Sequence, residues 1–267
     1  MDIAGYTSAI LIGFLLGLMG GGGSILTVPV LVYLFGTDAV LATGYSLFIV
    51  GFTSLVGGIR AFANKQIDFR AVSLFGMPSI LAIFVARHFI LPAIPEYLFT
   101  IGDLRIEKGN FLMLVFGLLM VFASISLLRS KSEKNAGDTG TTQTVQQYKL
   151  LGLLLPGIIV GLTTGLLGAG GGFLIVPALV ILIGLPMKMA VGTSLLIIAI
   201  NSLFGVVFSI GRYHFNWELV LVFTALSVAG VFAGTYISGK MDSLKLKKLF
   251  GWFVLVMGLV VIFKELT

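Results

Sequence analysis

The chain has 267 residues, of which 58% are hydrophobic and only 10% charged, and its mean hydropathy is +1.10. So little polar side chain does not cover a water-soluble surface, which excludes an ordinary soluble domain and predicts that lipid is the main solvent. The chain has no cysteine, which excludes disulfides, and its net charge of +6 lies in loops, where it sets membrane orientation.

Long apolar segments follow one another, each with the length that a helix needs to cross a hydrocarbon core of about 30 Å. Their approximate bounds are 3–35, 40–63, 71–92, 110–128, 150–184, 188–209, 218–238 and 249–264. The runs are continuous and do not alternate, so they predict transmembrane helices and exclude an outer-membrane barrel. The polar stretch 129–149 predicts a linker between two transmembrane repeats at 1–128 and 150–267.

The first segment of each repeat is the longest and is interrupted by glycine. Gly20 to Ser24 interrupt the first before Pro29, and Gly168 to Gly172 interrupt the second before Pro177. Each glycine loses about 1 kcal/mol of helix preference relative to alanine, and an interior proline removes a backbone hydrogen bond. We expect a broken helix, which in the first repeat has arms over 3–19 and 25–35. The arms return the chain to its starting side, as two short crossings or as a re-entrant hairpin.

The two repeats come from a duplication. Sliding the sequence by 148 residues places 13–58 on 161–206, and 21 of the 46 positions are then identical. The identical positions include glycines of both interrupted segments and the proline that follows each. Glycine and proline at fixed spacing are hard to match by chance, so the sequence predicts an internal repeat.

Charge predicts how the repeats are oriented. If each broken segment returns, twelve lysines and arginines lie on one side and five on the other, as the positive-inside tendency expects. Equivalent loops differ in charge, since Arg60 and Lys65 align with Phe208 and Tyr213. We expect an all-α polytopic membrane protein of two inverted-topology repeats, each with about four to five helical segments. It would lie in the inner (plasma) membrane as a multi-pass protein, with both termini outside and the linker 129–149 cytoplasmic.

The glycine breaks carry the main functional signal. Unpaired backbone at membrane depth is tolerated only inside protein or along a wet cavity, and the start of a helix favours an anion. Two such helix starts, related by a pseudo-two-fold axis, predict a substrate site at the midplane. Its candidate residues are Gly20, Gly21, Gly22, Gly23, Ser24, Gly168, Ala169, Gly170, Gly171 and Gly172.

Close helix packing is the alternative reason for the glycines. Gly13 with Gly17, and Gly161 with Gly165, have the small-xxx-small form that packs transmembrane helices together. For these four glycines we expect packing, whereas for the longer runs we expect binding.

Neutral donors on the second segment of each repeat are further candidates for the site. They are Tyr45, Ser46, Thr53 and Ser54 in the first repeat and Thr193, Ser194, Asn201 and Ser202 in the second. Such donors would hold an oxyanion without preventing its release. Hydrogen bonding of serine and threonine to their own helix is the alternative. Because Asn201 aligns with Thr53, the two half-sites are not chemically identical.

The positions of the ionisable residues restrict the possible functions further. All eleven carboxylates lie at termini, in loops or at segment edges, which argues against a cation carrier. Arg87, towards the end of the third segment, is expected to snorkel to the interface. The sequence has no H-E-x-x-H or phosphate-binding loop motif, so we expect no enzyme activity, cofactor, metal or nucleic-acid partner. Coupling to protons or sodium, and a homodimer, stay open.

At the glycine-broken segments the sequence resembles the sulfite exporter TauE/SafE family, also called the 4-toluene sulfonate uptake permease family. The resemblance rests on G-x-x-x-G-x-x-G-G-G-G-S-x-x-x-x-P from Gly13 to Pro29, its counterpart from Gly161 to Pro177, and A-x-G-x-S after Ala42 and Ala190. It spans both repeats and implies a transporter for sulfite, sulfonates or related organosulfur anions, with the glycine turns and nearby polar residues binding substrate.

We therefore expect a secondary transporter of small anions that works by alternating access around the midplane site. A passive anion channel and a non-transporting membrane scaffold protein are the alternatives.

Overall fold

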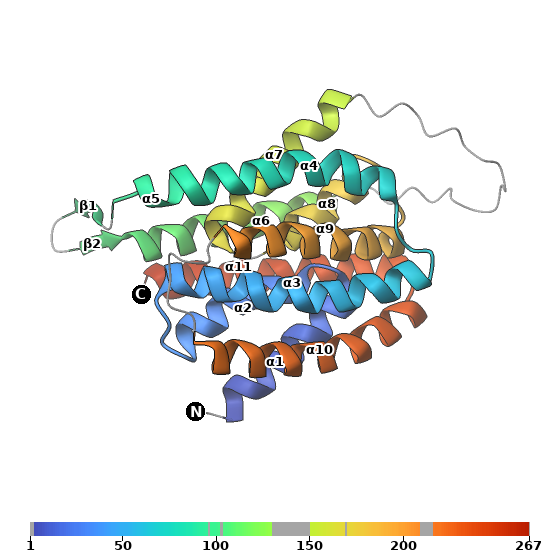
Figure 1. The fold of residues 1–267 in the computed structure, drawn as a ribbon, viewed down its shortest axis with the longest axis horizontal. Helices are drawn as coiled ribbons and strands as arrows, with labels where there is room; N and C mark the ends of the chain where they lie inside the picture. The colour runs from blue at the N-terminus through green and yellow to red at the C-terminus, as the bar shows by residue number, and fades with distance from the viewer. Residues whose placement is uncertain are drawn as a thin grey trace.

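The computed structural model describes residues 3–95, 97–101, 104–129, 150–168, 170–208 and 216–266. Ala169 and nearly all of the predicted linker 129–149 lie outside these residues. The described first repeat contains α1 (Ile3–Met19), α2 (Gly22–Tyr33), α3 (Ala39–Ala63), α4 (Phe69–Val85), a π-helical turn (Ala86–Ile90), α5 (Leu91–Ala93), β1 (Tyr97–Ile101), β2 (Leu104–Glu107) and α6 (Lys108–Arg129). The second contains α7 (Leu150–Leu167), α8 (Gly172–Ile181), α9 (Met187–Val207), α10 (Trp217–Lys240) and α11 (Ser243–Leu266), as Figure 1 shows.

Within the described residues, six helical stretches are long and apolar enough to cross a membrane. They are Ala39–Ala63, Phe69–Ala93, Lys108–Arg129, Met187–Val207, Trp217–Lys240 and Ser243–Glu265. Large apolar side chains on their outer faces are exposed, among them Met77 (72%) and Phe122 (74%), as expected where lipid replaces water. The predicted helical membrane fold is confirmed. The antiparallel hairpin of β1 and β2 is an addition that the helical pattern did not predict.

Both predicted helix breaks are present. α1 ends at Met19 and α2 begins at Gly22, while α7 ends at Leu167 and α8 begins at Gly172. The first pair folds back on itself, because a β-carbon added to Gly5 would lie 2.5 Å from the ring of Phe35. α2 has 12 residues and α8 has 10. At 1.5 Å per residue these helices are about 18 and 15 Å long, too short to cross about 30 Å of hydrocarbon, so the geometry favours re-entrant hairpins.

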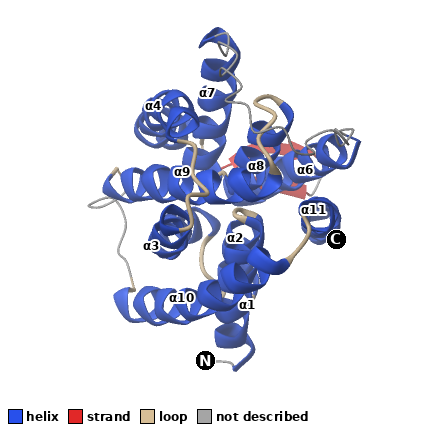
Figure 2. Ribbon diagram, turned by 90° about the vertical axis from the view of Figure 1, so that its right-hand side faces the viewer, coloured by secondary structure: helices blue, strands red, loops and turns tan. Residues whose placement is uncertain are grey.

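The helices at the two edges of the bundle pack in pairs, and each pair contains one helix from each repeat. α1 packs along α10 at one edge of the bundle and α7 packs along α4 at the other, with α2, α3, α8 and α9 between them (Figure 2). A β-carbon added to Gly13 would lie 1.8 Å from the carbonyl oxygen of Ser227, and one added to Gly161 would lie 2.3 Å from that of Ser79. These two contacts are equivalent under the 148-residue shift. The small-xxx-small glycines therefore pack helices, as predicted.

Equivalent helices of the two repeats run in opposite directions where they meet. Along α3, Gly51 lies against Ser202 and Gly57 lies against Leu195, so α3 and α9 are antiparallel. α6 and α11 are also antiparallel, since Gly117 lies against Ile262 and Gly251 against Leu128. Both pairs of equivalent helices are therefore antiparallel where they touch.

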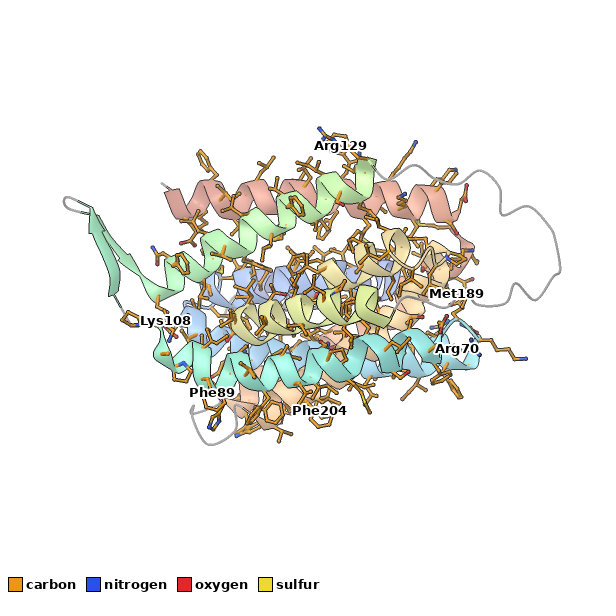
Figure 3. The ribbon with its side chains drawn as sticks, turned by 90° about the horizontal axis from the view of Figure 1, so that it is seen from above. Arg70, Phe89, Lys108, Arg129, Met189 and Phe204 are labelled. Carbon is orange, nitrogen blue, oxygen red and sulfur yellow. The ribbon has the colours of Figure 1, made fainter. Side chains whose placement is uncertain are left out.

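The two ends of the bundle differ in charge. One end, which we call the basic end, is formed by the ends of α3 and α10 and the starts of α4, α9 and α11 (Figure 1). It carries Arg60, Lys65, Arg70, Lys188, Lys240, Lys245, Lys247 and Lys248. The opposite end, which we call the hairpin end, holds β1, β2 and α5. Figure 3 shows Arg70 and Met189 towards the basic end and Phe89 and Lys108 towards the hairpin end.

Candidate functional site

The two glycine breaks meet inside the protein. A β-carbon added to Gly21 would lie 2.3 Å from the carbonyl oxygen of Gly172, and one added to Gly172 would lie 2.6 Å from Cα of Gly21. Both residues are buried. Only glycine allows two backbones to approach so closely. The N-terminal ends of α2 and α8 therefore lie together, and both helix dipoles favour negative charge there.

The second break has a left-handed backbone and lies beside two hydroxyl groups. Gly168, Gly170 and Gly171 have φ angles of +68°, +64° and +69°, a left-handed conformation that glycine adopts without strain. A β-carbon added to Gly170 would lie 3.1 Å from Oγ of Ser202, and one added to Gly171 would lie 2.1 Å from Oγ1 of Thr164. The backbone of this loop is therefore flanked by a hydroxyl on each side.

The first break has fewer left-handed residues. Only Gly20 is left-handed, with φ +72°, and its carbonyl oxygen accepts a hydrogen bond from Oγ of Ser194 at 3.0 Å. A β-carbon added to Gly23 would lie 2.0 Å from the carbonyl oxygen of Ile12. Gly22 instead faces the side chains of Met19 and Phe253, so it points towards apolar groups.

Several buried polar atoms have no hydrogen-bond partner within the described part of the chain. They are Oγ of Ser46, Ser54 and Ser202, Oγ1 of Thr164 and Oδ1 of Asn201. These side chains are between 0% and 1% exposed. Leaving a polar atom buried and unsatisfied costs about 1–3 kcal/mol, so such groups require an explanation such as a ligand. Because Ser202 and Thr164 flank the second break, the free hydroxyls and the start of α8 form one donor cluster.

Arg87 does not snorkel to the interface, which corrects the expectation from the sequence. Its side chain is 2% exposed, and Nη2 donates a hydrogen bond to Oγ1 of Thr43 at 3.0 Å. Thr43 in turn lies against Gly168, whose added β-carbon would be 2.4 Å from Cα of Thr43. A permanent positive charge thus lies one side chain away from the second break. Buried arginines in membrane helices are costly and mark functional regions.

Comparison with known proteins identifies the chain at this point. A family model for the sulfite exporter TauE/SafE matches residues 6–261. The chain belongs to the sulfite exporter TauE/SafE family. This TauE/SafE protein is 31% identical over 261 residues to a probable membrane transporter protein of Xylella fastidiosa. The alignment covers 96% of this chain and 92% of the relative. It is 28% identical over 249 residues to the probable membrane transporter protein YunE of Bacillus subtilis, in an alignment that covers 85% of this chain and 84% of YunE.

No solved structure matches the chain. With its family, its relatives and its apolar helices, this TauE/SafE protein is a multi-pass membrane transporter.

The remaining candidate residues of the transporter divide into two groups. Thr53 and Ser24 donate to carbonyl oxygens of Ile49 and Gly21, at 2.5 and 2.7 Å, which is the local hydrogen bonding considered as the alternative. Asn201 reaches across to α4, where its Nδ2 donates to Oγ of Ser79 at 2.6 Å. This bond links α9 to the helix that packs along α7.

Tyr45 and Thr193 lie away from the glycine breaks of the transporter. Oη of Tyr45 accepts a hydrogen bond from the backbone N–H of Asn216 at 2.8 Å, at the hairpin end. Oγ1 of Thr193 accepts one from the backbone N–H of Asp68 at 2.9 Å, at the basic end. These two equivalent residues hold loops at opposite ends of the bundle.

Sequence reasoning missed two residues near the second glycine break, Thr164 and Ser79, and placed Arg87 at the membrane interface. Thr164 aligns with Leu16, so the duplication gave no signal for it, and Ser79 lies on a helix that carried no candidate. The sequence signal for Arg87 was its position inside an apolar segment. Among the described residues no group of three or more metal-ligating side chains occurs.

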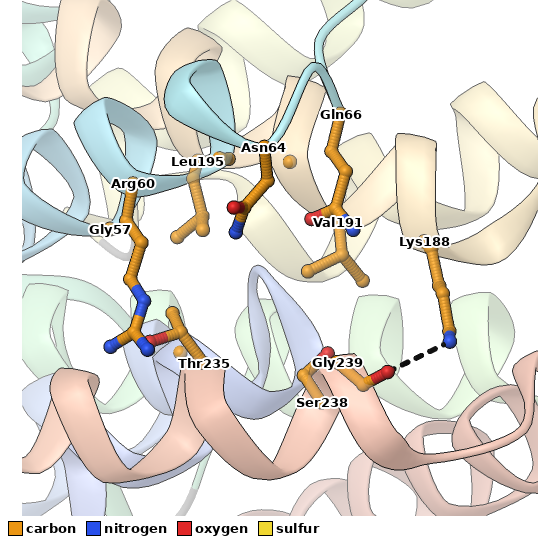
Figure 4. Close-up of a pocket in the computed structure, with 13 residues that line it drawn as sticks. Gly57, Arg60, Asn64, Gln66, Lys188, Val191, Leu195, Thr235, Ser238 and Gly239 are labelled. Atoms are coloured by element: carbon orange, nitrogen blue, oxygen red, sulfur yellow. Dashed lines mark hydrogen bonds between the residues drawn. The ribbon is translucent and has the colours of Figure 1, made fainter.

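Two cavities lie at opposite ends of the transporter. One opens at the basic end, between α1, α3, α9 and α10, and includes Arg60 and Lys188 (Figure 4). The other lies at the hairpin end between α2, α3 and α10, and includes Asp38 and Tyr45. The basic-end cavity shares Val191 with the first break, because a β-carbon added to Gly20 would lie 2.7 Å from Cα of Val191.

Proposed function

We propose that this chain is a secondary transporter, and not an enzyme, which carries small anions such as sulfite, sulfonates or related organosulfur compounds. The observation that carries the proposal is the second glycine break, where the start of α8 lies between the free hydroxyls of Ser202 and Thr164. The family name supports sulfur oxyanions as the class of substrate. The substrate would bind beside the contact of Gly21 with Gly172, near the middle of the membrane.

The donor set suits an oxyanion. The oxygens of sulfite or of a sulfonate accept hydrogen bonds, and the first N–H groups of a helix and the neighbouring hydroxyls donate them. No aspartate or glutamate is found among the buried polar side chains of the described residues, so no fixed negative charge opposes the anion there. The donors at the break are neutral, which permits release, while Arg87 supplies positive charge beside them.

We further propose that the repeats have inverted topology in the inner membrane, each repeat (1–128 and 150–267) forming one half of the transport unit. The equivalent contacts of Gly13 and Gly161, and the antiparallel α3 and α9, support this arrangement. The excess of lysine and arginine supports a cytoplasmic basic end, with the linker 129–149 inside and both termini outside. Alternating access would then move one edge pair of helices relative to the other around the glycine breaks.

Uptake into liposomes tests this function. Purified protein would be reconstituted and the uptake of radiolabelled sulfite followed, with methanesulfonate, sulfoacetate and sulfate as competitors and with proton or sodium gradients of either sign. We expect saturable uptake that the double change Ser202→Ala with Thr164→Val lowers at least tenfold, because each lost hydrogen bond to a charged ligand is worth about 1.5–3 kcal/mol. Gly22→Ala is the matched control, since Gly22 faces apolar side chains. Uptake no greater than that of empty liposomes under every gradient would rule out these substrates.

A passive anion channel is the second candidate, favoured by the lack of a buried carboxylate among the described residues. Counterflow separates the two functions. A carrier preloaded with unlabelled substrate accumulates labelled substrate transiently, whereas a channel does not.

A further inference from the structure

The basic-end cavity has the chemistry of an anion site. Six polar side chains line it: Arg60, Asn64, Gln66, Lys188, Thr235 and Ser238. No carboxylate is found among its lining residues, so two cations and four neutral polar groups face the same space. Figure 4 shows Arg60, Asn64 and Lys188 directed towards α10 across this space.

The two cations keep their positive charge available to a ligand. Nη1 of Arg60 donates to the carbonyl oxygen of Phe232 at 3.2 Å, and Nζ of Lys188 donates to that of Gly239 at 3.1 Å. Both acceptors are neutral carbonyl groups of α10. A carbonyl positions the side chain without neutralising it, and each cation retains further N–H donors.

The inner wall of the cavity lies next to the first glycine break. Gly17, in the last turn of α1, lines the cavity together with Val191. Val191 lies against Gly20, and Ser194 on the next turn of α9 bonds to the carbonyl oxygen of Gly20. A ligand in the cavity is therefore separated from the break by one layer of side chains.

The repeat relates this cavity to Arg87. Under the 148-residue shift Thr235 of the cavity corresponds to Arg87, and Val191 corresponds to Thr43, which bonds to Arg87. Each break therefore has a cationic region on the side that faces its own end of the bundle. At the hairpin end the cation is the buried side chain of Arg87, whereas at the basic end Arg60 and Lys188 line a cavity.

We propose that the basic-end cavity is a second anion site, a vestibule that collects the substrate oxyanion before it reaches the first glycine break. This inference deepens the proposed function and rests on it for the identity of the anion. Two cations beside a low-dielectric wall raise the local concentration of an anion and its rate of entry, and salt weakens the effect. A phosphate headgroup of an anionic lipid shares this chemistry, and the test separates it from a free anion.

Thiol labelling tests the vestibule without measuring transport. The chain has no cysteine, so Asn64→Cys introduces a single thiol into the cavity, and Thr37→Cys introduces one into the hairpin-end cavity beside Asp38. Each variant, in nanodiscs of neutral lipid, is treated with an anionic and with a cationic methanethiosulfonate reagent. We expect the Asn64→Cys thiol to favour the anionic reagent about tenfold over the Thr37→Cys thiol, because two nearby cations act on the reagent.

Charge variants and a competing anion complete the test. In the Asn64→Cys background, Arg60→Gln or Lys188→Gln should each lower the preference about threefold, whereas Arg60→Lys should retain it. Methanesulfonate at constant ionic strength should slow labelling, and the double charge variant should lose this protection. Equal labelling by both reagents, unchanged by the charge variants, would overturn the vestibule. In parallel nanodiscs that contain anionic lipid, slower labelling by the lipid alone, together with no protection by methanesulfonate in neutral lipid, would also overturn it, since a lipid headgroup would then be the occupant.

The outcomes of the two experiments are separable. If labelling shows no preference while liposome uptake is normal, the vestibule alone is wrong. If the preference is present but no anion is taken up, the cavity binds anions and the proposed central site is wrong.

Discussion

The two glycine breaks have nearly the same sequence and different backbones. Gly22 and Gly170 align, but Gly22 begins the helix α2, whereas Gly170 is left-handed and α8 begins only at Gly172. Gly22 faces the side chains of Met19 and Phe253, whereas Gly170 lies against Val50, Ile198 and the hydroxyl of Ser202. A duplicated motif thus supplies one turn with a single left-handed glycine and one with three, and the second lies beside free hydroxyls.

The repeated sequence therefore sets where each helix is broken, whereas the side chains packed around each break decide whether it can bind an anion. Thr164 stands where the first repeat has Leu16, and Asn201 stands where it has Thr53. Thr164 thus adds a hydroxyl beside the second break where the first repeat has an apolar side chain. We therefore expect the second break to contribute more of the anion binding, and the first to contribute more of the packing.

Alanine at the second break should have the largest effect on stability. In Gly170→Ala, at the position that aligns with Gly22, the left-handed backbone costs about 1–2 kcal/mol, and the clash of the added β-carbon with Val50 adds about 1–3 kcal/mol. Gly22→Ala, at a helical position facing the flexible Met19, should change the free energy of unfolding by less than about 1 kcal/mol. Thermal unfolding of the two variants in detergent, followed by size-exclusion chromatography, measures the difference. Equal losses would show that the two breaks are packed alike.

Removing one hydroxyl should separate transport from stability. Ser202→Ala should lower sulfite uptake about tenfold or more, because a hydrogen bond to a charged ligand is lost at the second break. Its thermal stability should stay the same or rise, since a buried unsatisfied hydroxyl is removed. Ser54→Ala, at the equivalent position of the first repeat, should have a smaller effect on uptake. If Ser54→Ala impairs uptake as strongly, the two half-sites bind the anion equally.

The bond between Asn201 and Ser79 should give the smallest effect. Asn201→Thr installs the residue of the first repeat and removes the bond to Ser79, which should cost about 1 kcal/mol of stability. A double-mutant cycle with Ser79→Ala measures the coupling between the two side chains. A coupling energy near zero would mean that α9 and α4 are not joined by this bond in solution.

Helix positions could be predicted from the sequence because they follow local physics. The arm predicted to end at Met19 does end there, since a run of glycine cannot sustain a helix at its start. The second arm, expected over 25–35, begins instead at Gly22, because neighbouring helices supply packing that overrides propensity. The hairpin β1–β2 comes from short strand-prone runs on both sides of a Gly-Asp pair, a pattern shorter than the helical runs around it.

Side-chain environments were harder to predict than helices. The interior position of Arg87 depends on the π-helical turn Ala86–Ile90, which changes the helical period and therefore the face on which a side chain lies. Which hydroxyls lack a hydrogen-bond partner also depends on the tertiary structure. Thr53 and Ser202 lie on equivalent helices, but only Thr53 reaches a carbonyl oxygen of its own helix.

The exchange of helix partners between the repeats affects how the protein is made. α1 is among the first segments to leave the ribosome, but its partner α10 begins at Trp217. At about 5–20 residues per second, α1 waits roughly 10–40 s before the helix that packs along it is synthesised. During that interval the small-residue face of Gly13 and Gly17 is open to lipid or to other chains. Neither repeat completes its own packing, so the two must assemble as one late step of membrane insertion.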